Sequence, residues 1–398
     1  MASYRGLNDL GPLIGKRALV RVDFNVPMDL QTHTITDDTR IRAALPTIRW
    51  LIGQSARVIL MSHLGRPKGP DPKFSLKPVA EHLATLLERP VAFVGELVGE
   101  AVNEAVAKLG PGDVLMLENV RFHPGETKND PELSRQLASL ADVYVDDAFG
   151  SAHRAHASVA GVPAFLPSAA GRLMERELTM LGEVLGNPDR PYWAIIGGAK
   201  VTDKVALLDR LVAMTDGLVI GGGMANTFLT AEGYDLGVSK VEADAVAKAK
   251  TLLQQARDRG ITIGLPVDLV VAEAFAPEAA HHVTTPDRVG NQELALDIGP
   301  LTVEAIRKWL STARTVFWNG PMGVFEWEAF SAGTMGVARV LAESTAKVVV
   351  GGGDSVAAVA KAGITDRLTH VSTGGGAALE FLEGKTLPGV LALAKSSG

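Results

Sequence analysis

Arginines follow several β-like runs in the first half of the chain. Arg66 comes after the apolar run Arg57–Met61, Arg121 comes after Val114–Leu117, and Arg40 heads a predicted helix. A planar guanidinium group binds carboxylate or phosphate oxygens through two parallel hydrogen bonds. Arginines that converge from several strand ends would therefore bind one small, multiply charged anion, although any one of them could be an ordinary surface residue.

Other polar residues stand at the same predicted strand ends. Asp23 and Asn25 could accept hydrogen bonds from a substrate hydroxyl group, and Arg154 follows the last predicted strand of this half. His63 precedes Arg66 by three positions and could equally be a core or surface histidine. Together these residues predict an anion site with hydrogen-bond acceptors beside its arginines.

Glycine clusters dominate the second half. Four apolar runs each lead into a cluster and then a predicted helix; the clusters are Gly197-Gly198, Gly221–Gly223, Gly351–Gly353 and Gly374–Gly376. Glycine lets the backbone approach a phosphate closely, and the helix N-terminus behind it offers free N–H groups. A single cluster is often only a tight turn, but four in one half of the chain indicate a nucleotide site.

Charged residues accompany two of these clusters. If a helix starts near Gly198, Lys200 and Lys204 lie on one face at its N-terminus, where lysine opposes the helix dipole. An anionic ligand would offset that cost; the alternative is a solvated face paired with Asp203 and Asp209.

Two acidic residues have open roles. Asp354 could hold Mg²⁺ against a phosphate or cap the following helix, and both could be true. Glu326 follows a Gly/Pro-rich loop and could accept from a ribose hydroxyl or be a surface residue.

Composition and missing motifs exclude several classes of protein. The net charge of −6 argues against a general nucleic-acid binder, and the absence of cysteine excludes disulfides, zinc–thiolate sites and a cysteine nucleophile. No P-loop and no Gly-x-Gly-x-x-Gly fingerprint is present, so a P-loop NTPase and the usual dehydrogenase fit poorly. Met1–Leu10 has no apolar run and no stretch is long enough to span a membrane, so we expect neither a signal peptide nor a membrane span.

Alternating strands and helices predict an α/β protein with parallel sheets, and 398 residues favour two domains. Helical periodicity is clearest in Thr39–Gly53 and Lys77–Leu87, and the runs Val267–Val271 and Thr315–Trp318 are predicted to complete the second sheet. We expect a first domain over residues 1–170, and residues 385–398 could also belong to it. A connector helix would occupy 171–187 and a nucleotide-binding domain 188–384.

Long motifs in the chain resemble those of the phosphoglycerate kinase family, in order, from about residue 5 to residue 390. They are Arg21–Pro27, Ser62–Pro67, Glu118–Phe122, Ala152–His156, Gly197–Lys200, Trp318–Pro321 and Gly351–Ser355. The resemblance implies two doubly wound, Rossmann-like domains facing a cleft that closes by hinge motion. It implies a glycolytic kinase that transfers a phosphoryl group reversibly from 1,3-bisphosphoglycerate to Mg-ADP, giving 3-phosphoglycerate and Mg-ATP.

The resemblance also implies roles for single residues. The glycerate substrate would be held by Asp23, Phe24, Asn25, Arg40, His63, Leu64, Gly65, Arg66, Arg121 and Arg154. The nucleotide would be held by Gly197, Gly198, Lys204, Gly221, Ala295, Asn319, Pro321, Glu326, Gly352, Gly353, Asp354 and Ser355, with Asp354 on Mg²⁺. The catalytic set would be Lys200, Arg40, Gly374 and Gly375.

One motif departs from the family pattern. Where the family usually has Gly-Leu-Asp-x-Gly-Pro, this chain begins the motif with Ala295, which puts one nucleotide contact in doubt. The expected ligands are 3-phosphoglycerate or 1,3-bisphosphoglycerate and ATP or ADP. We expect binding to neither nucleic acid nor a membrane, and we expect the protein to be a cytoplasmic monomer. The rival hypotheses are a non-catalytic nucleotide sensor and a dehydrogenase of doubly wound fold.

Overall fold

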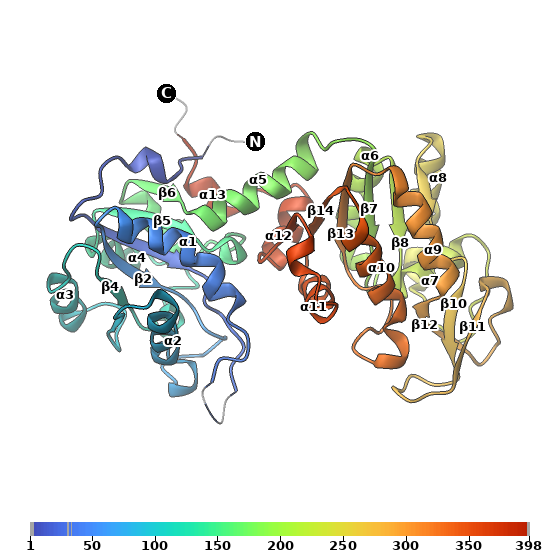
Figure 1. The fold of residues 1–398 in the computed structure, drawn as a ribbon, viewed down its shortest axis with the longest axis horizontal. Coiled ribbons are helices and arrows are strands. Elements are labelled where there is room, and N and C mark those ends of the chain that lie inside the picture. The colour runs from blue at the N-terminus through green and yellow to red at the C-terminus, as the bar shows by residue number, and fades with distance from the viewer. Residues whose placement is uncertain (1–3, 30–31, 33, 396–398) are drawn as a thin grey trace. The chain divides into compact units, whose positions relative to one another are not determined.

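The computed structural model describes residues 4–29, 32 and 34–395. Its internal contacts divide the chain into two compact units (Figure 1). Unit 1 comprises Met1–Thr179 and Gly384–Gly398, and unit 2 comprises Met180–Glu383. The division passes through the long helix α5 (Arg172–Gly186), the segment that the sequence predicts as a connector.

Unit 1 is built on a six-stranded sheet whose paired strands are all parallel, in the order β3-β4-β2-β1-β5-β6. The strands are β1 (Arg17–Val22), β2 (Arg57–Met61), β3 (Ala92–Phe93), β4 (Val114–Met116), β5 (Val143–Asp147) and β6 (Ser168–Ala170). Consecutive residues of β1, β2 and β5 are buried, so both faces of the central sheet are covered.

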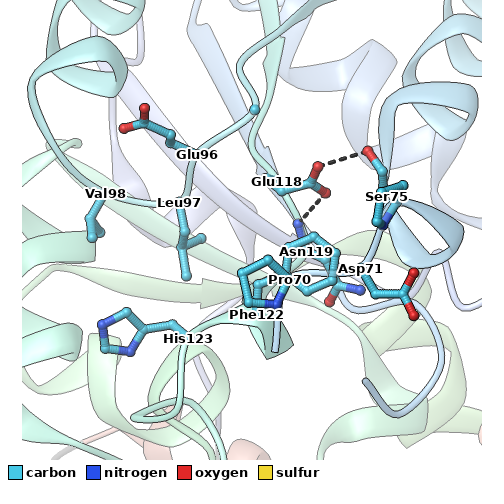
Figure 2. A pocket seen from close by; sticks show the side chains of 12 residues that line it. Pro70, Asp71, Ser75, Glu96, Leu97, Val98, Glu118, Asn119, Phe122 and His123 are labelled. Carbon is cyan, nitrogen blue, oxygen red and sulfur yellow. Dashed lines mark hydrogen bonds between the residues drawn. The ribbon is translucent and has the colours of Figure 1, made fainter. Parts of the chain in front are cut away.

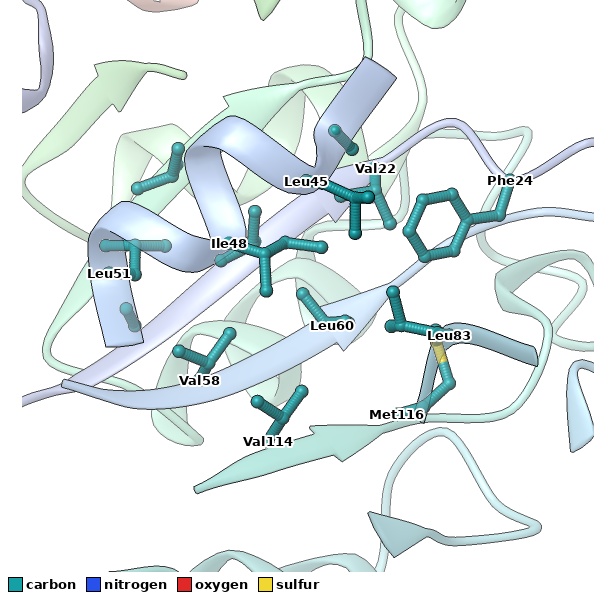
Figure 3. Close-up of a cluster of buried hydrophobic side chains, with 14 of the residues drawn as sticks. Val22, Phe24, Leu45, Ile48, Leu51, Val58, Leu60, Leu83, Val114 and Met116 are labelled. Carbon is teal, nitrogen blue, oxygen red and sulfur yellow. The ribbon is translucent and has the colours of Figure 1, made fainter. Parts of the chain in front are cut away.

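Five helices of unit 1 are α1 (Thr39–Gly53), α2 (Lys77–Leu87), α3 (Glu100–Ala107), α4 (Pro131–Ser139) and α13 (Pro388–Ala392). α1 is amphipathic: Leu45, Ile48 and Leu51 recur at helical spacing and point toward Val58 and Leu60 of β2 (Figure 3). The end of β1 carries Arg21 and leads directly into the loop with Asp23, so this core fixes the position of the polar strand ends above it.

The strand order of unit 1 reverses at β1. The chain first adds β2, β3 and β4 on one side of β1 and then places β5 on the other side. In open parallel sheets, ligands bind beyond the carboxyl ends of the strands at such a switch point. The ends of β1 and β5 therefore mark the expected ligand site of unit 1.

Unit 2 repeats this plan with a six-stranded parallel sheet in the order β15-β14-β13-β7-β8-β9. Its strands are β7 (Tyr192–Ile196), β8 (Gly217–Ile220), β9 (Thr262–Gly264), β13 (Thr315–Asn319), β14 (Lys347–Val350) and β15 (His370–Val371). Its helices are α6 (Val205–Met214), α7 (Gly222–Ala231), α8 (Val246–Asp258), α9 (Pro300–Trp309), α10 (Ala332–Glu343), α11 (Gly353–Lys361) and α12 (Gly376–Leu382). Here the switch point lies between β7 and β13.

The prediction that Val267–Val271 belongs to the second sheet is wrong. The strand found there, β10 (Leu269–Ala272), pairs antiparallel with β11 (His281–Thr284) and β12 (Leu294–Ile298) in a separate three-stranded sheet. The connections between these strands contain no crossover helix, and a parallel partner would need one.

The end of the chain belongs to unit 1. Arg5 N donates to Leu393 O over 3.1 Å, and Gly389 N donates to Ala152 O over 2.9 Å. A Cβ on Gly389 would touch Val159 and Ala152, so glycine allows α13 to lie directly against this part of unit 1.

Candidate active site

Positive charge gathers at the carboxyl edge of the unit 1 sheet. Arg121 is partly buried, and its pKa is lowered to about 10 by burial and by the nearby charges of Arg154, Arg21 and Arg66. Its Nε atom is buried without a hydrogen-bond partner among the described residues. A cluster of guanidinium groups that depress one another's pKa, with an unused donor, is suited to an anionic ligand.

Asp23 is the carboxylate at the end of β1 and accepts from Arg40 over 2.5 Å. Burial raises the pKa of Asp23, but the positive charges around it, including Arg40 and Arg21, outweigh this and keep the pKa below the ordinary value. Asn25 Oδ1 accepts from Gly65 N over 2.8 Å, which joins the loop after β1 to the loop after β2. The structure thus brings the predicted residues Asp23, Arg40, His63 and Asn25 together.

Two side chains anchor the loops that carry the arginines (Figure 2). Glu118 accepts from Ser75 Oγ over 2.7 Å and from Leu76 N over 2.9 Å, at the start of α2. Asn119 Nδ2 donates to Leu64 O and Phe74 O over 2.8 and 2.9 Å. The loop with Gly65 and Arg66 is therefore tied to the one with Arg121, beside a cavity of about 540 Å³.

Phe24 and Leu64 do not present their side chains to a ligand. Both belong to the hydrophobic core of unit 1, and Figure 3 shows the Phe24 ring beside Leu83. Phe24 N donates to Ser62 Oγ over 2.8 Å. Only main-chain atoms of these two residues remain for contact with a substrate, because the apolar side chains are needed in the core.

Sequence reasoning assigned no role to Arg21, which the structure places at the centre of the cluster. It is 1% exposed and contacts Ser158, Ser151 and His63. The signal was present in the sequence: a charged residue inside an otherwise apolar strand must find buried partners.

Unit 2 has a cavity of about 530 Å³ at the carboxyl edge of its sheet. Among the predicted nucleotide-binding residues, the lining includes Gly198, Ala295, Pro321, Glu326 and Asp354. Its apolar wall comes from Leu294, Leu296, Val324 and Phe275, and Gly222 and Gly223 add bare backbone. An apolar slot with few polar groups at its rim is typical of a small-molecule site.

Two of the predicted glycines serve packing. A Cβ on Gly197 would overlap the carbonyl oxygen of Pro321, and one on Gly221 would overlap the sulfur of Met322. Neither glycine lines the cavity. They allow the loops after β7 and β8 to contact the loop after β13, whose Pro321 and Met322 line the cavity.

Lys204 sits at the switch point of unit 2. Its Nζ donates to Gly197 O over 2.7 Å and to Asn319 Oδ1, and thus bridges the ends of β7 and β13. Asn319 Nδ2 in turn donates to Gly351 O over 2.6 Å, and Ser355 Oγ accepts from Gly320 N over 2.5 Å. Burial lowers the pKa of Lys204 to about 8, against the opposing effect of Asp354.

The prediction that Lys200 and Lys204 share a helix face is wrong. Helix α6 begins at Val205, and Lys200 lies exposed in the preceding loop. Between them, Thr202–Lys204 forms a single 3-10 turn, and Glu242 accepts from Val201 N and, over 2.6 Å, from Thr202 Oγ1 at its start.

Comparison with known proteins decides the family. A model of the phosphoglycerate kinase family matches residues 7–385. The phosphoglycerate kinase of Moorella thermoacetica is 58% identical over 97% of this chain and 98% of its own, and that of Herpetosiphon aurantiacus is 55% identical over 95% and 96%. The structure of phosphoglycerate kinase from Coxiella burnetii, 42% identical, superposes with a TM-score of 0.90 over 99% of this chain and 100% of the other. The chain belongs to the phosphoglycerate kinase family.

Family membership makes the chain a glycolytic phosphotransferase with ATP or ADP as co-substrate. The phosphoglycerate kinase fold, with its two six-stranded parallel sheets, confirms the predicted fold class. Among the described residues, no helix is both long and apolar enough to cross a membrane.

Asp354 lies in the first turn of α11, and Gly352, with φ +94°, holds the capping position. Asp354 is therefore not the helix cap, and its carboxylate lines the cavity. Within the described part of the chain, no group of three or more acidic or histidine side chains could hold a metal ion. One carboxylate fits Mg²⁺ that is held mainly by nucleotide phosphates and water.

The last glycine cluster starts a short helix. Gly375, with φ +50°, precedes α12, and a Cβ there would meet open space. The left-handed backbone at this position explains why glycine is used.

Proposed function

We propose that the arginine cluster of unit 1 binds 3-phosphoglycerate or 1,3-bisphosphoglycerate, and that the cavity of unit 2 binds Mg-ADP or Mg-ATP. The observation that carries this assignment is the chemistry at the two switch points. One gathers guanidinium groups around Asp23 and His63, and the other joins an apolar slot to Lys204 and Asp354. The activity is reversible phosphoryl transfer between these ligands.

The residues fit this reaction because phosphoryl transfer depends mainly on alignment and preorganised positive charge. Lys200 accompanies the transferred group, and Arg40, Gly374 and Gly375 add charge and N–H donors to it. The attacking atom is already a carboxylate or phosphate oxygen, so no general base is required. The protonation state of His63 is consistent with this, because burial lowers its pKa to about 3 and keeps the ring neutral.

In unit 2, the nucleobase occupies the apolar part of the cavity and Glu326 accepts from the ribose. The phosphates lie toward Gly198, Lys204 and Asp354, where Mg²⁺ joins them to the Asp354 carboxylate. Ala295 lines the same cavity, and its methyl group contributes to the apolar wall.

The activity is tested by following ATP consumption with 3-phosphoglycerate, coupled to NADH oxidation. We expect turnover that needs both substrates, stops on removal of Mg²⁺ with EDTA and returns when Mg²⁺ is added in excess. ATP binding without turnover would favour the nucleotide-sensor hypothesis. Turnover that persists without any divalent cation would overturn the role of Asp354 as a Mg²⁺ ligand.

Transfer requires the reacting oxygens to come within about 3–3.5 Å of each other. We therefore expect the units to close when both ligands are bound, with flexing at the ends of α5 near Gly171 and Gly186. Small-angle scattering should give a smaller radius of gyration for the ternary complex than for the free enzyme or either binary complex. The same radius in all four samples would contradict closure.

A monomeric state and a cytoplasmic location complete the proposal. Light scattering coupled to size-exclusion chromatography checks the first: a mass near 41.9 kDa is expected.

A further inference from the structure

A row of four buried polar side chains lies beneath the arginine cluster of unit 1. Glu126 and Ser158 are fully buried, Arg21 is 1% exposed and His63 is 6% exposed. They come from separate parts of the unit: the loop before α4, the turn Ala157–Gly161, strand β1 and the loop after β2. We call them the Glu126–His63 row.

Hydrogen bonds join neighbouring members of the Glu126–His63 row, and Arg21 donates to the neighbour on each side. Ser158 Oγ donates to Glu126 Oε1 over 2.6 Å, and Ser158 N donates to Glu126 Oε2 over 2.9 Å. Arg21 Nε then donates to Ser158 Oγ over 2.8 Å. The hydroxyl proton points to Glu126, so the oxygen lone pairs face Arg21 and fix the plane of its guanidinium group.

The last contact determines which nitrogen of His63 carries the proton. Arg21 Nη2 lies 3.1 Å from His63 Nδ1. A guanidinium group has only donors, so His63 Nδ1 must accept and the ring proton must be on Nε2. The competing arrangement, Nδ1–H donating to Asp23 Oδ1, spans 3.9 Å and is too long for a hydrogen bond.

The charges around His63 act in the same sense. Burial lowers its pKa to about 3, Asp23 opposes this, and Arg21, Arg121 and Arg40 add to the lowering. His63 is therefore neutral at physiological pH, where it has a single N–H donor. His156, 3.7 Å from Glu126 Oε1, is also held neutral, with a pKa lowered to about 4 mainly by burial.

We propose that Glu126, Ser158 and Arg21 are positioning residues that lock His63 as the Nε2–H tautomer, so that Nε2–H donates a hydrogen bond to an oxygen of the anionic substrate. The row thus makes His63 a fixed neutral donor among cationic ones. This inference rests on the proposed function for the identity of the anion. The tautomer itself can be tested without any substrate.

The first test uses the wild-type enzyme labelled with ¹⁵N-histidine and long-range ¹H–¹⁵N NMR. The signals of His63 are assigned as those missing from a His63→Gln sample. We expect a non-protonated Nδ1 and a protonated Nε2, unchanged between pH 5.5 and 8. A proton on Nδ1, or titration of the ring within that range, would overturn the proposal.

The second test compares Ser158→Ala with Ser151→Ala. Both serines contact Arg21, but Ser151 does so at 3.5 Å and only Ser158 connects it to Glu126. We expect Ser158→Ala to give a mixture of His63 tautomers and to raise KM for 3-phosphoglycerate by about tenfold, with KM for ATP unchanged. Ser151→Ala should leave the tautomer and both KM values near wild type.

If the two serine variants showed the same His63 tautomer and the same KM for 3-phosphoglycerate, the positioning role would be overturned. If Ser158→Ala does not fold, Glu126→Gln serves in its place, because it keeps the shape and removes the charge that orients Ser158. Absence of wild-type activity with 3-phosphoglycerate and ATP would refute the proposed function instead, whereas the NMR result would still decide the tautomer.

Discussion

Replacing Lys200 by alanine is expected to lower kcat by roughly 10²–10³ and to leave nucleotide affinity within a few-fold. Lys200 is exposed in the loop between β7 and α6, next to Ala199 of the cavity lining. A cation that meets the phosphoryl group only during transfer contributes little to ground-state binding. Steady-state kinetics and direct nucleotide titration measure the two effects separately.

Two other lysines make this experiment specific. Lys250 is exposed on α8, and Lys250→Ala should behave as wild type. Lys204 already binds two strand-end loops, so Lys204→Ala should mainly raise KM for the nucleotide by disturbing the cavity. A Lys200→Ala enzyme with near-normal kcat would refute the catalytic role, and a Lys204→Ala enzyme that lost kcat alone would exchange the roles of the two lysines.

Replacing Arg121 by alanine is expected to weaken 3-phosphoglycerate binding by about 10- to 150-fold, the range for losing a hydrogen bond to a charged group. ATP binding should be unaffected, because ATP is assigned to unit 2. Arg121→Lys keeps the charge but not the planar fork and should give an intermediate loss. Calorimetric titration with each ligand measures these effects.

Arg135 provides the control, because it is an exposed arginine of unit 1 paired with Glu132. Arg135→Ala should bind both ligands normally. Arg121 also donates to Gly65 O, so a structural role must be separated from a binding role. Equal losses for 3-phosphoglycerate and ATP, together with a lowered unfolding temperature, would show that Arg121 supports the fold and does not mark the substrate site.

The periodicity of apolar residues was sufficient to predict a helix where one face of that helix covers the core. The bounds predicted for α1 and α2 are those found, because their apolar residues recur at helical spacing against the sheet. The antiparallel sheet of β10, β11 and β12 was not predictable in the same way. A short apolar run has the same appearance in either sheet, and its partners are decided by how the chain returns.

The site shows the same limit. Strand-end arginines could be predicted to gather, because carboxyl ends of parallel strands share one edge. The sequence could not show that Arg21 would be enclosed by Ser158 and His63, since these partners lie far apart in the chain. Nor could it separate Gly198, which lines the cavity, from Gly197, which is required by the approach of Pro321. Such distinctions depend on tertiary distances.

The position of α13 has a consequence for how the protein is made. Gly389 packs on Ala152 and Val159, immediately beside the segment that carries Arg154 and Ser158. During synthesis, every residue of unit 2 is added before this last piece of unit 1, which begins at Gly384. Domains generally fold as units, and N-terminal ones usually fold first during synthesis, but unit 1 cannot complete its packing until the end of the chain has been made. Chain termination just before Gly384 would leave unit 2 with all of its residues and unit 1 without α13.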